Sequence, residues 1–172
     1  GAFAQAINAM TTAGYNNINL AASSAPALWA LMLLMFIGGA PAGTSGGIKT
    51  TTAVTLFAVL VSRLKGRDFV RFNGKDIPQE KVFVASSALI FYMIVLYAVI
   101  LLLTISENAP FLEILFDSLA ALSTTGLSLG LTEQMSAFGK LVLIFAMFVG
   151  RIGVITFGLA FFMRERQPRE RE

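Results

Sequence analysis

The chain has 172 residues, of which 56% are hydrophobic and 13% are charged, and its mean hydropathy is +0.74. This balance excludes an ordinary soluble domain and indicates an integral membrane protein. Without cysteine or histidine, the chain has no disulfides, thiolate metal sites or histidine-based catalysis. Its net charge of +3 comes from basic residues beside hydrophobic segments, which the positive-inside rule explains, so we expect no nucleic-acid partner.

The N-terminal part predicts a short helix, a polar loop and an interrupted helix. Residues 1–10 are apolar, but they are too few to cross a bilayer core of about 30 Å, which needs about 20 residues. A polar, turn-forming segment follows at 11–17. Apolar runs at 27–37 and 48–64 are then separated by a break. We therefore expect a re-entrant helix and loop, followed by one helix that is broken inside the membrane.

The break is rich in residues that a membrane helix cannot continue through. Backbone groups freed at this depth must be satisfied by protein or by a water-lined cavity, which is typical of channels and transporters. We expect this stretch to be a gate. Its candidate residues are Gly38, Gly39, Gly43, Gly46, Gly47 and Lys49.

The second half predicts a basic linker, a full span, another re-entrant segment and a second full span. The linker at 65–81 and the charged tail at 164–172 are expected on the cytoplasmic side. The spans are expected at 82–105 and 141–162, and the short helix at 111–122. The outer segments should form an acidic mouth that concentrates cations, with four carboxylates against Lys140: Glu107, Glu113, Asp117 and Glu133.

An internal repeat relates the two halves. Gly14 falls on Gly126 and Gly38 falls on Gly150 at one offset, because 126 − 14 and 150 − 38 both equal 112. The repeating unit is a helix, a re-entrant loop and a helix, and both loops enter from the outside. The first copy lacks its leading helix, so we expect the chain to begin within a unit. Two such units cannot close a pore, so we expect further repeats upstream or pairing with other chains.

Each re-entrant loop carries a Thr-x-Gly tripeptide after its short helix. Glycine permits backbone angles that align carbonyl oxygens toward a dehydrated cation, and a neighbouring threonine hydroxyl can add an oxygen. A single tripeptide would fit an ordinary turn, but two in register favour a cation filter. The candidate filter residues are Thr12, Ala13, Gly14, Tyr15, Thr124, Thr125, Gly126 and Leu127.

Arg151 stands near the middle of the last span, where an arginine costs about 3 kcal/mol. It either binds free backbone carbonyls of the broken helix or places a fixed positive charge on the ion path, and the two roles are compatible. Lys49 has the same two interpretations, with anchoring of a helix end as the simpler one. A nucleotide-binding loop at 43–50 is disfavoured, because Ile48 separates Lys49 from the last glycine and a helix precedes the run.

These motifs resemble the Trk/Ktr/HKT superfamily of potassium transporters, and most closely the bacterial Ktr membrane subunit. The resemblance rests on the two loops, the glycine-rich stretch at 38–52 and the run at 150–153. It implies part of the third and all of the fourth of four pore repeats: residues 1–64, a linker at 65–81, residues 82–163 and a tail at 164–172. It also implies a filter built from four loops, a gate at 38–47 and a basic residue below the filter, matching Arg151.

The resemblance further implies a homodimer, a cytosolic nucleotide-binding regulatory ring and activation by sodium. Two features depart from the family: the first two repeats are absent, and Pro41 stiffens the gate. We therefore expect an all-α integral membrane fold of potassium-channel type in the bacterial plasma membrane. The expected function is K⁺ uptake, without enzymatic activity and without a cofactor other than K⁺ as cargo and Na⁺ as activator.

Two alternatives stay open at this point. The chain could be a non-conducting anchor whose basic segments dock a soluble ATPase or regulator. It could also be a broken-helix transporter for a small anion, with the helix that begins near Ile48 facing the substrate. The acidic outer mouth argues against the second alternative.

Overall fold

A computed structural model of the chain describes residues 2–15, 20, 23–40, 45–66, 69–72 and 75–152. The helices are α1 (Ala2–Thr11), α2 (Ala25–Ile37), α3 (Thr50–Leu64), α4 (Gln79–Ser106), α5 (Phe111–Leu122), α6 (Leu131–Gln134) and α7 (Ala137–Ile152). A two-residue hairpin, β1 (Arg71–Phe72) and β2 (Lys75–Asp76), lies between α3 and α4.

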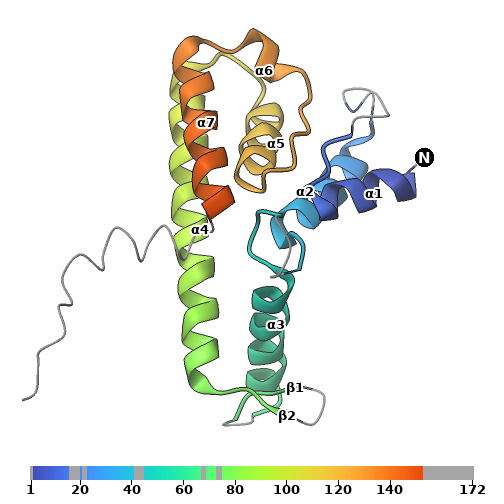
Figure 1. The fold of residues 1–172 in the computed structure, drawn as a ribbon, viewed down its shortest axis with the longest axis vertical. Coiled ribbons are helices and arrows are strands. Elements are labelled where there is room, and N and C mark those ends of the chain that lie inside the picture. The colour runs from blue at the N-terminus through green and yellow to red at the C-terminus, as the bar shows by residue number, and fades with distance from the viewer. Residues whose placement is uncertain are drawn as a thin grey trace, which may run out of the picture.

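Helix α4 is the longest of the described helices, and α3, α5 and α7 pack along it (Figure 1). Its 28 residues extend about 42 Å, more than the hydrocarbon core requires. Helices α5 and α7 pack on its upper half and α3 packs on its lower half, while α2 contacts α5 and α1 packs on α2 (Figure 1). Of the described residues, only α4 forms a helix long and apolar enough to span a membrane.

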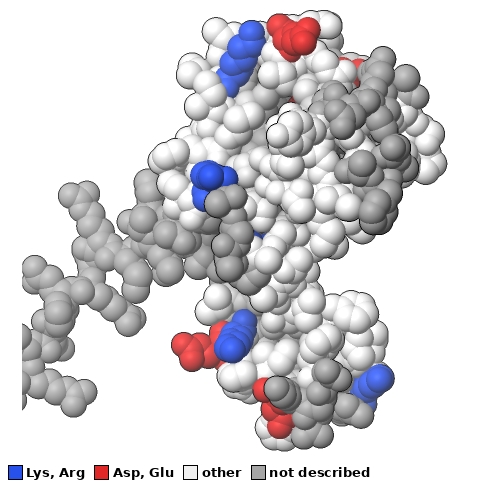
Figure 2. Space-filling model, turned by 45° about the vertical axis from the view of Figure 1, so that its right-hand side comes forward, with Lys and Arg blue, Asp and Glu red and all other residues white. Residues whose placement is uncertain are grey.

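The outer surfaces of α4 and α7 are apolar. Exposed side chains on these two helices include Phe83, Ile90, Ile94, Tyr97, Leu101, Ile105, Leu141, Ile144 and Phe148. Figure 2 shows charged side chains near the two ends of one face, with few charged side chains between them. A soluble monomer rarely exposes so much apolar surface, whereas a lipid-facing surface requires it.

The expected helical architecture is confirmed. The helix expected at 111–122 has the same bounds as α5, and the span expected at 82–105 lies inside α4. The span expected at 141–162 begins earlier, at Ala137, and is described to Ile152. The rest of it and the tail at 164–172 lie outside the described residues. The small hairpin within the linker and the single turn α6 were not expected, because neither has a periodic apolar pattern.

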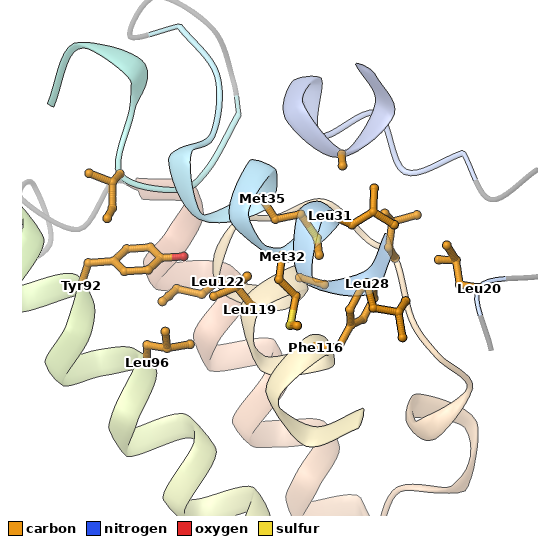
Figure 3. Packing of buried hydrophobic residues seen from close by; sticks show 14 of the residues in the cluster. Leu20, Leu28, Leu31, Met32, Met35, Tyr92, Leu96, Phe116, Leu119 and Leu122 are labelled. Carbon is orange, nitrogen blue, oxygen red and sulfur yellow. The ribbon is translucent and has the colours of Figure 1, made fainter. Parts of the chain in front are cut away.

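One hydrophobic cluster joins α2, α4 and α5. Figure 3 shows Leu31, Met32 and Met35 of α2 facing Phe116, Leu119 and Leu122 of α5, with Tyr92 and Leu96 of α4 alongside. The rings of Phe36 and Tyr92 meet edge to face, with their centroids 5.4 Å apart. This cluster connects the broken helix to the short helix of the other repeat.

A second cluster joins α4, α5 and α7 through Val99, Leu103, Ile114 and Ala146. Gly150 of α7 lies so close to α5 that a Cβ atom there would overlap the carbonyl oxygen of Leu122. The inner end of α5 is therefore fixed against the backbone of α7.

Candidate functional site

The two loops that the sequence predicts to be re-entrant pore loops have similar backbone angles, and they are called the first and second pore loops after that prediction. In the first pore loop, residues 12–15, φ is +57° at Thr12 and +75° at Gly14; in the second pore loop, residues 124–127, it is +56° at Thr124 and +76° at Gly126. Positive φ is uncommon for a β-branched residue such as threonine, so its occurrence at both equivalent positions is informative. Each loop also begins with the same hydrogen bond, from Ala13 N to Asn8 O (3.3 Å) and from Thr125 N to Ala120 O (2.9 Å).

The two pore loops lie against each other. A Cβ atom at Gly14 would lie 3.0 Å from the carbonyl oxygen of Thr125, and one at Gly126 would lie 3.9 Å from Cα of Gly14. Loops that are 112 residues apart in sequence therefore meet at one place. Only glycine allows this approach without displacing the neighbouring backbone.

The hydroxyl group of Thr125 in the second pore loop is engaged in a local hydrogen bond. Thr125 is 1% exposed, and its Oγ1 lies 2.7 Å from Oγ of Ser123. Its hydroxyl is thus turned into the protein, while its carbonyl oxygen faces Gly14. The sequence suggested that a threonine hydroxyl adds an oxygen to an ion site, but at Thr125 the backbone carbonyl is the available oxygen.

The outer ends of the two pore loops are held by different side chains. Asn8 Nδ2 donates to the carbonyl oxygen of Tyr15, and Tyr15 N donates to Asn8 Oδ1 at 3.1 Å. In the second copy, Asp117 accepts hydrogen bonds from Ser128 and Leu129, which follow the loop directly. No sequence motif pointed to Asn8, and Asp117 was expected at the acidic outer mouth.

That assignment of Asp117 is wrong, because its side chain is 3% exposed and lies behind the second pore loop. Glu107 is also engaged, because its carboxylate accepts hydrogen bonds from the backbone N–H and the hydroxyl of Ser136, which precedes α7. These bonds lower the pKa of Glu107. Two of the four expected mouth carboxylates therefore have structural partners.

The segment between α2 and α3, residues 38–49, folds back on itself and is called the gate loop below. Helix α2 ends at Ile37, and Gly38 has a φ of +67°. Ile48 N donates to Phe36 O at 3.2 Å and Thr50 N donates to Gly39 O at 3.1 Å. These bonds hold the start of α3 beside the end of α2. The expected break in the helix is therefore present between α2 and α3. Gly43, one of the expected gate residues, lies outside the described residues.

The gate loop lies directly beneath the pore loops. Gly46 N donates to Thr124 Oγ1 at 3.2 Å, and a Cβ atom at Gly46 would lie 2.5 Å from the carbonyl oxygen of Ser123. On the other side, a Cβ atom at Gly39 would lie 3.4 Å from the carbonyl oxygen of Met10. The loop thus contacts the ends of both short helices.

One basic side chain belongs to the gate loop and another interacts with it electrostatically. Lys49 is half-buried and its ammonium group donates to the carbonyl oxygen of Ser45. Arg151 follows Gly150 in the last turn of α7, and its positive charge repels that of Lys49. Together they place positive charge beside the loop and close to the inner ends of the short helices.

The chain matches known proteins along nearly its whole length. The model of the TrkH family, described as a cation transport protein, matches residues 1–170. The chain is 34% identical to the Ktr system potassium uptake protein B of Bacillus subtilis, over 90% of this chain and 35% of that protein. It is 32% identical to the protein of the same name from Vibrio alginolyticus, over 97% and 36%.

A third relative is the potassium/sodium uptake protein NtpJ of Enterococcus hirae. The identity is 34% over 84% of this chain and 33% of that protein. The chain therefore spans about a third of the length of the curated relatives it matches.

Proposed function

Because this chain belongs to the TrkH family of cation transport proteins, we propose that it forms part of a potassium uptake pathway in the bacterial plasma membrane. The observation that carries the proposal is the meeting of two pore loops with matching backbone angles at Thr12, Gly14, Thr124 and Gly126. The names of the relatives, which specify uptake of potassium or of potassium and sodium, support K⁺ as the cargo. The role is transport and not catalysis.

The pore loops are the proposed selectivity filter. A potassium ion enters such a filter when carbonyl oxygens replace its hydration water. Residues 12–15 and 124–127 would supply two of the four walls, and the remaining two would come from the rest of the transporter. The exposure of Ala13 and Gly126 and the placement of Thr125 O fit this role.

The gate loop is the proposed barrier beneath the filter. Its contacts with Ser123 and Thr124 support a position across the inner side of the second pore loop. Lys49 and Arg151 would raise the energy of a cation at this level, because like charges repel strongly where water is scarce. Opening would be a displacement of this loop, for which its glycines provide backbone freedom.

The proposed topology and assembly are those that the resemblance to the Trk/Ktr/HKT superfamily implies. The linker at 65–81 and the tail at 164–172 would lie in the cytoplasm of a multi-pass protein. The two further pore repeats, a second copy of the transporter and a cytosolic nucleotide-binding ring would complete the assembly. Sodium would act as an activator, which is consistent with the potassium/sodium name of one relative.

Uptake of Rb⁺ by the complete transporter in proteoliposomes tests the function. We expect uptake that K⁺ inhibits much more strongly than Na⁺ does on the outer side, and stimulation by Na⁺ at a separate site. A protein that binds a soluble regulator but transports no Rb⁺ would instead be a non-conducting anchor.

The gate is tested by Arg151→Ala and by deletion of residues 40–45. We expect each to raise Rb⁺ flux by about tenfold, since removing about 1.4 kcal/mol of barrier has that effect. Arg63→Ala is the control, because Arg63 lies at the far end of α3. Unchanged flux in both gate variants would contradict this gate.

A further inference from the structure

Asp117 is a buried carboxylate whose hydrogen bonds all lead to the chain that leaves the second pore loop. Oδ2 accepts from Ser128 Oγ at 2.8 Å and from Thr132 Oγ1 at 2.9 Å, and Oδ1 accepts from Leu129 N at 3.2 Å. Ser128 Oγ also accepts from Gly130 N at 3.0 Å. A buried carboxylate is tolerated only when such donors replace its water.

The course of the chain explains this arrangement. Helix α5 runs inward to Leu122, and after Gly126 the chain returns outward along the same helix, which brings residues 128–132 beside Asp117. Ser128 is only two residues beyond Gly126. The carboxylate therefore holds the outer end of the second pore loop, while the bond from Thr125 N to Ala120 O holds its inner end.

The returning segment borders an open cavity of about 480 Å³, lined in part by Asp117, Gly126, Ser128, Leu129 and Glu133. Within this chain, the hydrogen bonds to Asp117 hold the segment beside that cavity. Leu127, 3% exposed, is the apolar anchor between Gly126 and the bonded residues.

The equivalent position of the first repeat is Gln5, since 117 − 5 = 112, and it is also buried, at 6% exposed. There the outer end of the pore loop is held by the neutral side chain of Asn8. The second pore loop is thus held by the carboxylate of Asp117, and the first by the neutral amide of Asn8. Hydrogen bonds to a charged acceptor are roughly twice as strong as neutral ones.

We propose that Asp117, through Ser128, Leu129 and Thr132, is a positioning residue that determines ion selectivity by holding the outer end of the second pore loop. The proposal rests on the transport function proposed above. Carbonyl oxygens select K⁺ over Na⁺ only while their spacing or number is maintained. Release of this loop end would let the carbonyls move closer to the smaller ion and weaken the discrimination.

A field effect is the competing explanation, because a carboxylate near the mouth also attracts cations. The two explanations differ in what they change. Attraction raises the local concentration of K⁺ and Na⁺ equally and leaves their ratio alone, whereas positioning changes the ratio. Glu133 lines the same cavity and is exposed, so it provides a matched test of the field.

The experiment compares Asp117→Asn, Thr132→Val, Thr132→Ser and Glu133→Gln in the complete transporter in proteoliposomes. Inhibition of Rb⁺ uptake by K⁺ and by Na⁺ gives the selectivity ratio, and the protection of purified protein against heat by each ion gives a second value without transport. We expect Asp117→Asn to lower the ratio about tenfold, as loss of a hydrogen bond to a charged group can do. Thr132→Val should lower it less, while Thr132→Ser and Glu133→Gln should retain it.

Unaltered ratios in both Asp117→Asn and Thr132→Val would overturn the proposal, as would an equal change in Glu133→Gln. A fall in uptake without a change of ratio would also overturn it, because this would show only a structural role. If Asp117→Asn does not fold, the comparison of Thr132→Val with Thr132→Ser decides. Failure of the unaltered protein to discriminate K⁺ from Na⁺ would instead refute the proposed function.

Discussion

The backbone N–H of Gly46 donates a hydrogen bond to the side-chain hydroxyl of Thr124 at 3.2 Å, across 78 residues of sequence. Thr124 belongs to the second pore loop and Gly46 to the gate loop. The carbonyl oxygen of Ser123 lies against the same glycine. The two loops are therefore in direct contact, and displacement of the gate loop must break a bond to a residue of the proposed filter.

Thr124→Val removes the hydroxyl acceptor and keeps the branched shape. We expect the gate loop to leave its closed position more often, with Rb⁺ flux several-fold higher, because the loss of one hydrogen bond is worth about 1 kcal/mol. Thr12→Val is the matched control, since Thr12 has the same backbone angle in the first pore loop. Equal flux changes in the two variants would show that the threonine conformation matters and the bond to Gly46 does not.

The glycines at the meeting of the pore loops should differ in sensitivity. Alanine at either position is strained by the positive φ, at a cost of about 1 kcal/mol. At Gly14 the new methyl group would also lie 3.0 Å from the carbonyl oxygen of Thr125, whereas at Gly126 the nearest atom is 3.9 Å away. Gly14→Ala should therefore reduce K⁺ over Na⁺ selectivity more than Gly126→Ala, as measured by competition for Rb⁺ uptake.

Equal effects of the two substitutions would contradict this prediction and would mean that strain within each loop dominates over contact between the loops. The reverse order would contradict it as well. Gly126→Ser, with a larger polar side chain, should also reduce selectivity.

The repeat offset predicted more of the site than the residue types did. It placed Gly14 and Gly126 at equivalent positions, and their φ values agree within a degree. The bounds of α5 also followed from sequence, because its apolar run is delimited by Pro110 and by the polar residues after Leu122. These features depend on local pattern, which a single sequence contains.

The residues that hold the loops did not follow from the pattern. Asp117 has partners 11 to 15 residues away, and their position depends on how the chain returns along α5. Asn8 bonds to Tyr15 across a turn whose geometry the sequence does not specify. On a short apolar helix, a polar residue could equally face water or a returning loop, and only the tertiary arrangement decides between them.

Close packing of α7 on α5 predicts unequal costs for two glycine substitutions in α7. A methyl group at Gly150 would overlap the backbone of Leu122, which cannot move without shifting the inner end of α5. At Gly139 it would meet only the end of the Glu107 side chain, which can swing away. Gly150→Ala should therefore destabilise the protein by about 1–3 kcal/mol, as overpacking does, and Gly139→Ala by less.

Thermal unfolding of the purified transporter measures this difference. Because Gly150 adjoins the base of the second pore loop, Gly150→Ala should also lower the K⁺ over Na⁺ ratio. Equal melting temperatures for the two variants would contradict the close contact between α7 and Leu122.

Glu107 gives the fold a dependence on pH. Hydrogen bonds from the side chain and then the backbone of Ser136 lower its pKa from the ordinary 4.5, and Lys140 adds a small favourable charge. The carboxylate lies at the start of α7, where the helix dipole also favours a negative charge. The ionised form is thus bound better in the folded state than in the unfolded state, and this stabilisation is present above pH 4.5 and lost as pH falls through the lowered pKa.

The melting temperature of the unaltered protein should therefore exceed that of Glu107→Gln at neutral pH, and the difference should shrink as the pH falls below 4.5 and through the lowered pKa of Glu107. Other carboxylates titrate in the same range, so the difference between the variants is the quantity to follow. Glu133→Gln, at an exposed position on α6, is the control for the loss of a surface carboxylate. A constant gap between Glu107→Gln and the unaltered protein from neutral to acidic pH would mean that Glu107 contributes through packing and not through its charge.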